Sequence, residues 1–338
     1  MTSQQIQYVI ALAEERNFSK AAERLFISQP ALSQFVKNVE KEVGMPLFDR
    51  GTNPIQLTPA GEIYLKTAKE ILMTEKELQR RIADLSELTT GHFVIGTSPF
   101  RASCLLPKSI REFEKRHPGI RLEIVTDHVS QLKQMLLVGD IDLCIEADDF
   151  DTTLYHNEEL FQENYYLALS NKFELNGENK DKVLTKQDIL EDSKKMYTVR
   201  ELSMNEIINI PFIQMKNGTC FSNTIQKICR ELKYQPSEVL EVSQIETAFH
   251  WINEGLACGL IPDTLIRYGN FEKHPFYYKV RARNSSRPIV VAMKKNRYVT
   301  HAMQEYITVL RELIGFGTWS TTPDNEKNRG NNKKDTEI

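Results

Sequence analysis

The sequence NFSKAAERLFISQPALSQ, residues 17–34, has the pattern of two short helices joined by a tight turn. Ser19 is the expected N-cap of the first helix, and a turn follows at Phe26. Ser28 is the expected cap of the second helix, and Pro30 suits a first turn because its missing N–H has no intrahelical partner there. The inner face of the first helix is apolar: Ala21, Ala22 and Leu25. This stretch therefore predicts a helix–turn–helix.

The flanking sequence extends this unit on both sides. Apolar residues recur at helical spacing within residues 4–14, which predicts a helix before the stretch. The second helix of the pair is expected to end at Gly44, because glycine readily adopts the left-handed conformation that follows helices. Residues 46–58 then have the pattern of a short hairpin around a Gly-Thr-Asn-Pro turn.

A long helix is expected after the hairpin. Thr58 is its expected N-cap and Pro59 its first residue, and the helical pattern continues to about Thr89. Its apolar residues recur with a 3,4 spacing: Tyr64, Ala68, Ile71, Leu78, Ile82 and Leu85. Little else in the sequence offers this helix a packing surface, so its expected partner is the same helix of a second chain. A core helix of a larger domain is the alternative.

A different pattern begins at Gly91. Strands and helices are expected in alternation at residues 92–96, 105–116, 120–125, 131–138 and 141–145. This β-α-β-α-β order predicts a parallel, doubly wound sheet. Further strands are expected at residues 165–169, 212–215, 240–242, 259–262, 276–280 and 289–293, before a closing helix at 300–313. Residues 318–338 are polar without periodicity, which is typical of a disordered tail.

Composition places the chain among ordinary globular proteins. Its 338 residues are 41% hydrophobic and 26% charged, with a formal net charge of −3. Residues 1–60 hold six basic and six acidic side chains, so any nucleic-acid binding would depend on where the positive charges lie. No stretch approaches the roughly 18 apolar residues of a membrane span, and no secretory signal begins the chain. We expect a cytoplasmic protein without membrane contact.

The sequence lacks the motifs of common enzymes and metal sites. It contains no G-x-G-x-x-G, P-loop, G-x-S-x-G or H-E-x-x-H motif. Its five cysteines form no C-x-x-C pair, which argues against a structural zinc site and against a disulfide scaffold. We therefore expect no catalytic residues, no metal ligands and no cofactor.

The stretch at residues 17–34 resembles the helix-turn-helix of LysR-type transcription regulators. So do its continuation VEKEVGMPLFDR at 39–50 and LTPAG at 57–61. The later sequence is similar to the sensing domain of that family more loosely, at Gly96, LLP 105–107, GDIDL 139–143 and EGLACGLIP 254–262. The resemblance covers roughly residues 1–315.

The resemblance implies an α+β protein of several domains. Residues 1–58 would form a winged helix-turn-helix, residues 59–89 a linker helix for dimerisation, and residues 91–316 an effector-binding domain like a periplasmic binding protein. Two α/β subdomains would make up that last domain. The implied bounds are 91–163 with 269–316 for subdomain I, 164–268 for subdomain II, and 317–338 for a disordered tail.

The resemblance also implies that the second helix of the pair enters a major groove of double-stranded DNA. Glutamine can pair with adenine edges and serine with either base type, while a helix N-terminus suits a phosphate. The expected DNA-binding residues are Ser28, Gln29, Pro30, Ser33, Gln34, Lys37 and, in the hairpin, Arg50. Many family members have Arg where this chain has Gln34, so the base sequence stays open. Expected partners are an imperfect palindromic operator, further copies in a homodimer or homotetramer, and RNA polymerase.

The effector is expected between the two subdomains, because ligands of open α/β sheets lie beyond the carboxyl ends of the strands. The expected effector-binding residues are Ser98, Phe100, Arg101, His128, Ser130, Asn217, Gly218 and Thr219. Helix N-termini favour anions and Arg101 adds positive charge, so a small carboxylate or other oxyanion is the expected effector.

A second hypothesis keeps the DNA-binding regulator and changes its signal. Gly218-Thr219-Cys220 resembles the redox-cysteine region of peroxide-sensing members of the family, and Cys229 lies nine positions later. A cysteine near a helix N-terminus would hold more thiolate. Peroxide-sensing members carry threonine near the peroxide and a histidine after the second cysteine, where this chain has Phe100, Val129 and Val239. We therefore favour a metabolite over peroxide.

Overall fold

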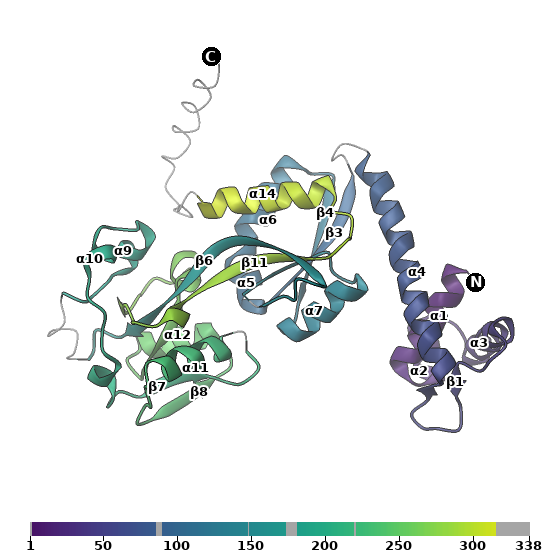
Figure 1. Ribbon diagram of the computed structural model, residues 1–338, viewed down its shortest axis with the longest axis horizontal. Coiled ribbons are helices and arrows are strands. Elements are labelled where there is room, and N and C mark those ends of the chain that lie inside the picture. The colour runs from purple at the N-terminus through teal and green to yellow at the C-terminus, as the bar shows by residue number, and fades with distance from the viewer. Residues whose placement is uncertain (1, 86–89, 148, 174–180, 220, 316–338) are drawn as a thin grey trace, which may run out of the picture. The chain divides into compact units, whose positions relative to one another are not determined.

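The computed structural model describes residues 2–85, 90–147, 149–173, 181–219 and 221–315. The chain divides into two compact units, a first unit at Met1–Ser86 and a second unit at Glu87–Ile338 (Figure 1). The expected tail at 317–338 and the end of the long helix at residues 86–89 lie outside the described residues.

The first unit begins with three helices: α1 (Ser3–Glu15), α2 (Phe18–Arg24) and α3 (Gln29–Val43). Asn17, and not Ser19 as expected, caps α2, because its side-chain oxygen accepts from the backbone N–H groups of Ser19 and Lys20 at 2.9 and 3.1 Å. The turn at Phe26 has a positive φ of 57°, and the Ser28 hydroxyl accepts from Ala31 N–H to cap α3. The buried core of these helices includes Val9, Leu12, Ala21, Ala22, Leu32, Val36 and Val39.

A short antiparallel hairpin and a long helix complete the first unit. The hairpin strands are β1 (Phe48–Asp49) and β2 (Gln56–Leu57), and the helix is α4 (Pro59–Asp84). The Thr58 hydroxyl accepts from Gly61 N–H at 3.0 Å and donates to the Pro46 carbonyl at 2.7 Å. A Cβ on Gly61 would lie 2.0 Å from the Leu47 carbonyl oxygen, so only glycine fits where the helix meets the hairpin.

Several of the apolar side chains expected along the long helix are exposed to solvent. Ala68 is fully buried, but Leu78 is 58% exposed, Ile82 60% and Leu85 82%. The far half of the helix therefore carries large apolar side chains that are not covered within the described part of this chain.

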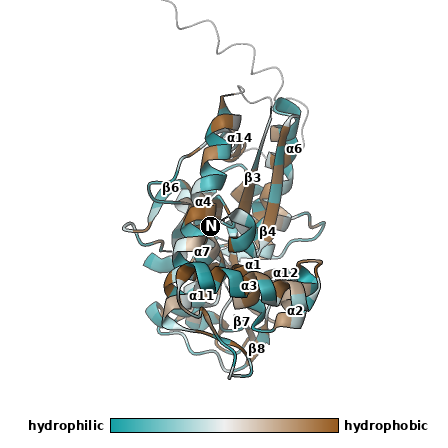
Figure 2. Ribbon diagram, turned by 90° about the vertical axis from the view of Figure 1, so that its right-hand side faces the viewer, coloured by the Kyte–Doolittle hydropathy of each residue, from teal (hydrophilic) through white to brown (hydrophobic). Residues whose placement is uncertain are grey.

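The second unit contains two lobes. Lobe 1 has the parallel strands β3 (Gly91–Thr97), β4 (Ile120–Thr126) and β5 (Leu143–Glu146), with β3 in the middle. Its helices are α5 (Pro99–Cys104), α6 (Leu106–Arg116), α7 (Val129–Val138) and α14 (His301–Gly315). The α6 and α14 helices share one hydrophobic core with the sheet, and α7 contributes to another. The amphipathic α14 alternates between hydrophobic and hydrophilic residues along its length (Figure 2).

Lobe 2 repeats the same arrangement. Its parallel strands are β7 (Phe212–Met215), β8 (Val239–Val242) and β9 (Cys258–Pro262). A further strand, β10 (Phe276–Tyr278), pairs with none of these three. The larger helices are α11 (Ser222–Glu231), α12 (Ile245–Asn253) and α13 (Asp263–Tyr268). Short helices precede them: α9 (Lys186–Leu190), α10 (Lys195–Thr198) and the 3-10 turn η1 (Met204–Ile207). A second 3-10 turn, η2 (Arg283–Ser285), follows β10.

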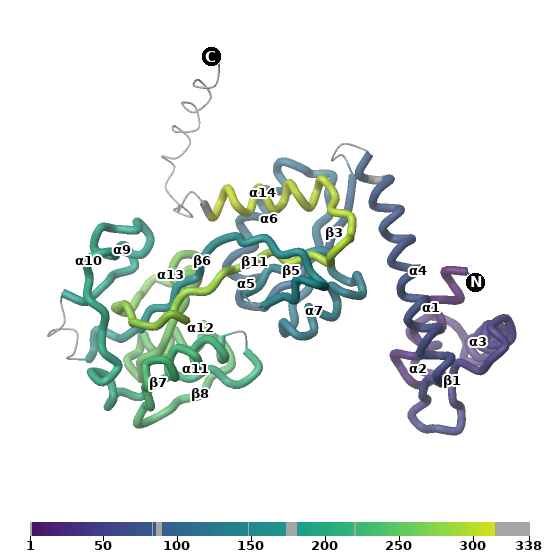
Figure 3. Tube along the Cα trace, in the orientation of Figure 1, coloured from purple at the N-terminus to yellow at the C-terminus, as the bar shows by residue number. Residues whose placement is uncertain are grey.

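Two long antiparallel strands join the lobes. They are β6 (Tyr155–Leu169) and β11 (Ser286–Lys294), which run side by side from one lobe to the other (Figure 3). The strand order is β4-β3-β5-β11-β6-β9-β7-β8, with β10 paired to β6. The parallel sheet expected from the β-α-β-α-β order is confirmed in β3, β4 and β5, and the crossover strands are antiparallel to their neighbours.

The expected return to subdomain I at residue 269 is too early. Tyr277 and Tyr278 pair with the lobe 2 end of β6 and belong to the lobe 2 core. The chain re-enters lobe 1 along β11, after Ser286. The expected strand at 165–169 is likewise only the end of β6, which begins ten residues earlier, at Tyr155.

Candidate functional site

Helix α3 presents a polar face opposite its buried one. Leu32, Val36 and Val39 point into the core, while the other side carries the recognition face, defined here by four residues: Gln29, Ser33, Gln34 and Lys37. Three of the four side chains are exposed and Ser33 is partly so. The Gln34 amide donates to the Asn38 side chain at 3.0 Å. The expected DNA-binding residues on α3, with Ser28 and Pro30 at its N-terminus, thus lie on one exposed helical face and end.

Arg50 lies at the end of the first hairpin strand and is tied to α3. Its guanidinium lies 2.8 Å from a Glu40 oxygen and over the Phe18 ring at 5.5 Å. The other Glu40 oxygen accepts from the N–H groups of Leu47 and Phe48. Glu40 thereby fixes the hairpin against α3, and Arg50 keeps about a third of its side chain exposed for an outside partner.

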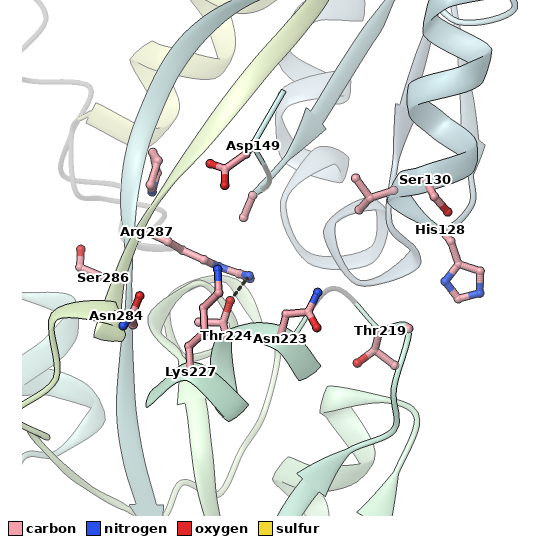
Figure 4. A pocket seen from close by; sticks show the side chains of 14 residues that line it. His128, Ser130, Asp149, Thr219, Asn223, Thr224, Lys227, Asn284, Ser286 and Arg287 are labelled. Carbon is pink, nitrogen blue, oxygen red and sulfur yellow. Dashed lines mark hydrogen bonds between the residues drawn. The ribbon is translucent and has the colours of Figure 1, made fainter. Parts of the chain in front are cut away.

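The second unit contains two adjoining cavities between its lobes. The larger has a volume of about 380 Å³ and the smaller about 90 Å³, and both are lined by His128, Val129 and Thr219. The smaller is lined by apolar and polar groups at the carboxyl ends of β3, β4 and β8, among them Ser98, Phe100, Phe221, Ser243 and Gln244. The larger is mainly polar (Figure 4).

Six of the eight expected effector-binding residues line these cavities: Ser98, Phe100, His128, Ser130, Gly218 and Thr219. Ser98 is only 5% exposed, and its hydroxyl has no hydrogen-bond partner within the described residues. It precedes α5 without capping that helix. A buried hydroxyl without a partner costs free energy unless a ligand or water satisfies it.

The other two expected residues do not line either cavity. Asn217 accepts hydrogen bonds from Gln226 at 2.9 Å and from Ser222 at 3.4 Å, so it organises the start of α11 instead. Arg101 is fully buried between two carboxylates. The expectation that Arg101 contributes charge to an effector is therefore wrong in this structure.

Arg101 belongs to a buried ion cluster at the junction of the lobes. It lies 3.2 Å from Glu146 at the end of β5 and 3.1 Å from Glu163 on β6. Arg287 on β11 approaches the other Glu163 oxygen at 2.7 Å, and the Thr264 hydroxyl donates to Glu163 at 2.6 Å. Burial would raise the pKa of Glu163, but Arg101 and Arg287 together lower it to about 2. Glu163 is therefore charged at neutral pH and is paired with two arginines.

Several residues of the larger cavity were not expected from the sequence. Asn223 and Lys227 lie one turn apart on α11, which could have been found by projecting that helix after Thr219. Arg287 comes from a strand far along the chain, and no local pattern indicates its position. The further lining residues not expected are Ala147, Asp149, Thr224, Asn284, Ser286 and Pro288.

Among the described cysteines, Cys144 and Cys258 are buried, and Cys104 and Cys229 are partly buried. Burial raises the pKa of Cys229 to about 11 and that of Cys258 to about 12. Cys229 also packs against the hydrophobic core of lobe 2. Cys220 lies outside the described residues. Cys229 is therefore a poor nucleophile at neutral pH.

The described part of the chain has neither a cluster of metal ligands nor a helix fit to cross a membrane. No three His, Cys, Asp or Glu side chains gather there as metal ligands would. None of the helices described combines the length and the apolar character that crossing a membrane requires.

Comparison with known proteins agrees with this geometry. Residues 3–62 match the bacterial regulatory helix-turn-helix protein of the lysR family, and residues 86–193 and 195–315 match the LysR substrate binding domain. The HTH-type transcriptional regulator YcgK of Bacillus subtilis (strain 168), itself uncharacterized, is 27% identical over 311 residues, which cover 91% of this chain and 94% of that protein.

Solved structures share the fold of both units. A full-length variant of OxyR from Pseudomonas aeruginosa has a TM-score of 0.62 and 22% identity, covering 93% of this chain and 94% of that one. Full-length CbnR bound to its target DNA has a TM-score of 0.58 and 20% identity, covering 92% and 99%. The two family matches span most of the sequence, and the chain belongs to the LysR family of DNA-binding transcriptional regulators, which are not enzymes.

Proposed function

We propose that this regulator binds an operator through α3 and the hairpin, and that a small anion bound between the lobes controls it. The observation that carries the effector part is the Ser98 hydroxyl, which is buried at the cavity wall without a partner in the described chain. The DNA part rests on the exposed recognition face of α3. The residues of both parts lie within the segments that match the family, 3–62 and 86–193.

On the DNA side, the recognition face would enter the major groove, with Gln29, Ser33 and Gln34 at base edges and Lys37 near a phosphate. Ser28 and Pro30 at the α3 N-terminus would approach the backbone, because a helix N-terminus attracts anions. Arg50 would contact the backbone or the minor groove beside the hairpin.

On the effector side, uncommitted polar groups line both walls of the cavities. The side chains of His128 and Ser130 on the lobe 1 wall, and of Asn223 and Lys227 on the lobe 2 wall, make no side-chain hydrogen bond or ion pair among the described residues. Donors on facing walls suit a ligand with acceptor oxygens, and the Lys227 ammonium favours a negative one. Such a ligand would shift the regulator between two states by binding one of them more tightly.

Assembly would use the exposed apolar residues of α4. Two such helices side by side would bury Leu78, Ile82 and Leu85, and two dimers would form a homotetramer on an imperfect palindromic operator. RNA polymerase would be a further partner, and the cytoplasm the compartment. A Leu78→Asp variant should be a monomer by light scattering and lose tight DNA binding. A wild-type monomer at micromolar concentration would contradict this assembly.

Peroxide sensing through Cys220 and Cys229 is the rival signal. The raised pKa of Cys229 counts against it, because a disulfide forms through a thiolate. A reporter assay of the Cys220→Ser, Cys229→Ser double variant separates the two. Intact induction by a metabolite is expected, whereas a lost response together with a peroxide-induced 220–229 disulfide would favour the redox model.

The test of the whole proposal is footprinting on the DNA upstream of neighbouring genes, with and without a panel of small anionic metabolites. We expect protection of two half-sites that changes with one anion, and the same change in Ser98→Ala only at about two- to twelvefold higher anion concentration. Protection that no anion alters, in the wild type, would contradict the effector part and leave the DNA part standing.

A further inference from the structure

The lobe 2 wall of the larger cavity carries a set of groups suited to an anion. Asn223 and Lys227 are separated by one helical turn of α11, and both are exposed to the cavity. Thr224, on the same helix, accepts a hydrogen bond from Arg287 at 2.9 Å, drawn in Figure 4. Arg287 therefore lies beside Lys227 and Asn223, where two cations and an amide face one space. Asp149 belongs to the opposite wall in the same view.

Arg287 is held in this position from three sides. Its Nε and Nη2 approach one Glu163 oxygen at 2.8 and 2.7 Å, and Nη1 donates to Thr224. The guanidinium also lies over the rings of Tyr165 and Phe221, at 5.2 and 5.5 Å from their centroids. Cation–π contact and packing would keep the group in place even when one ionic partner changes.

Glu163 has other partners besides Arg287. Its first oxygen accepts from Arg101 at 3.1 Å and from the Thr264 hydroxyl at 2.6 Å. Arg101 also reaches the second oxygen at 3.4 Å. If Arg287 turned toward a ligand, Glu163 would remain charged and paired, so this exchange avoids a lone buried carboxylate.

We propose that Lys227, Asn223 and Arg287 form a second anion subsite, so that the effector carries two oxyanionic groups. One group lies at Ser98 and His128 in the smaller cavity, and the other lies at Lys227, where it competes with Glu163 for Arg287. This inference rests on the proposed effector cavity and names the class of ligand. Elongated dicarboxylates and phosphorylated carboxylates both belong to that class.

The competition acts where the lobes are joined. Arg287 and Glu163 are paired residues of β11 and β6, the two crossover strands. Arg101 links Glu163 to Glu146 at the end of β5 in lobe 1, while Thr264 links it to α13 in lobe 2. A ligand that takes Arg287 from Glu163 thereby changes contacts of both lobes with the strands between them. Arg287 acts as a positioning residue as well as a ligand-binding one.

The test compares succinate with butyrate, which have the same number of carbons and differ by one carboxylate. Calorimetric titration of the full-length protein should give at least about tenfold tighter binding for succinate. Lys227→Met should remove most of that preference, because it should weaken succinate binding far more than butyrate binding. Arg230→Met is the matched control, because Arg230 is an exposed cation of α11 that does not line the cavity.

A second variant tests the competition itself. Glu163→Gln removes the charge that competes for Arg287, so succinate should bind about three- to tenfold tighter while butyrate does not change. Equal affinities of the wild type for both probes would overturn the second subsite and leave the single-anion cavity standing. Failure of both probes to bind at millimolar concentration would contradict both proposals. Should Glu163→Gln not fold, the exposed Lys227→Met still decides the question.

Discussion

The two units of this protein differ in whether their charged side chains are buried. No charged side chain described between residues 2 and 85 is buried, and the polar groups of the α3 recognition face are exposed or partly exposed. The second unit buries charges within its fold: Arg101, Asp142, Glu146, Glu163 and Asp263. In the first unit an arginine such as Arg50 is available to an outside partner. In the second unit Arg101 is fully buried and paired with two carboxylates of the fold.

This difference separates two kinds of functional residue. A contact to DNA is made by whatever a short helix exposes, so its residues follow from local spacing. A contact to a small ligand is made by groups that several distant segments bring together, after the internal ion pairs have formed. Changes in the second unit should therefore affect stability and ligand binding, whereas changes in the first unit should affect DNA selectivity.

The largest effect is expected on stability in the second unit. Arg101→Met should lower the free energy of unfolding by about 3–5 kcal/mol, because Glu146 and Glu163 would remain buried without it. Urea unfolding followed by Trp251 fluorescence would measure this, since both tryptophans lie beyond residue 86. The exposed Arg111→Met serves as the control. A loss below about 1 kcal/mol would remove the contrast between the units.

The next effect is on pH dependence. Burial raises the pKa of Asp263 to about 6. The hydrogen bonds from Asn164 and the charge of Arg267 lower this pKa in part, and the nearby charge of Glu163 raises it further. The folded state therefore binds this proton more tightly than the unfolded chain. The stability due to Asp263 should fall by up to about 3 kcal/mol as pH rises from about 4 to 6.

Asp263→Asn should flatten this part of the stability curve, measured by urea unfolding at successive pH values. Asp140→Asn, an exposed carboxylate, should leave the curve unchanged. A wild-type curve that rises steadily across the same interval, with the same slope in Asp263→Asn, would show that Asp263 is not the titrating group.

A smaller effect is expected on DNA selectivity in the first unit. Gln29→Ala or Ser33→Ala should relax the base preference by about 1–3 kcal/mol at one base pair, measured by competition gel shift with single-base operator variants. Effector binding should not change, because these residues lie in another unit. Gln7→Ala on α1 is the exposed control. Unaltered preference in both variants would contradict the proposed docking of α3.

The smallest effect separates ligand binding from stability. Ser98→Ala should weaken effector binding by about 0.5–1.5 kcal/mol and leave the free energy of unfolding unchanged, because the Ser98 hydroxyl has no partner among the described residues. Ser109→Ala is the opposite control, since that buried hydroxyl donates to Leu106 and contacts Tyr306. It should destabilise the protein without altering affinity. A destabilised Ser98→Ala would indicate a structural role.

The first unit could be predicted almost completely because its signals are local. The caps at Ser28 and Thr58 and the stop at Gly44 lie within a few residues of the helices they bound. The one error there moved a cap from Asn17 to Ser19, and both residues are of capping type. Spacing and turn chemistry were sufficient, since the partners of each residue are near in sequence.

The cavity could be predicted only in part. Ser98, His128 and Thr219 follow strand ends and were found by that rule. The interpretation of Arg101 as a ligand failed because its partners Glu146 and Glu163 lie 45 and 62 positions away. The first half of β6 was missed because its residues are mostly polar and partly exposed. The position of Arg101 and the start of β6 both depend on partners far away in the sequence, which local patterns do not predict.

The glycine at the start of α4 has a mechanical consequence. Since Gly61 lets the helix touch the Leu47 carbonyl, and Thr58 bonds the neighbouring Pro46 carbonyl, the hairpin and the first helical turn share their backbone contacts. Arg50 lies three positions beyond Leu47 on that hairpin. Through these contacts a rotation of α4 would be transmitted to the hairpin and to Arg50.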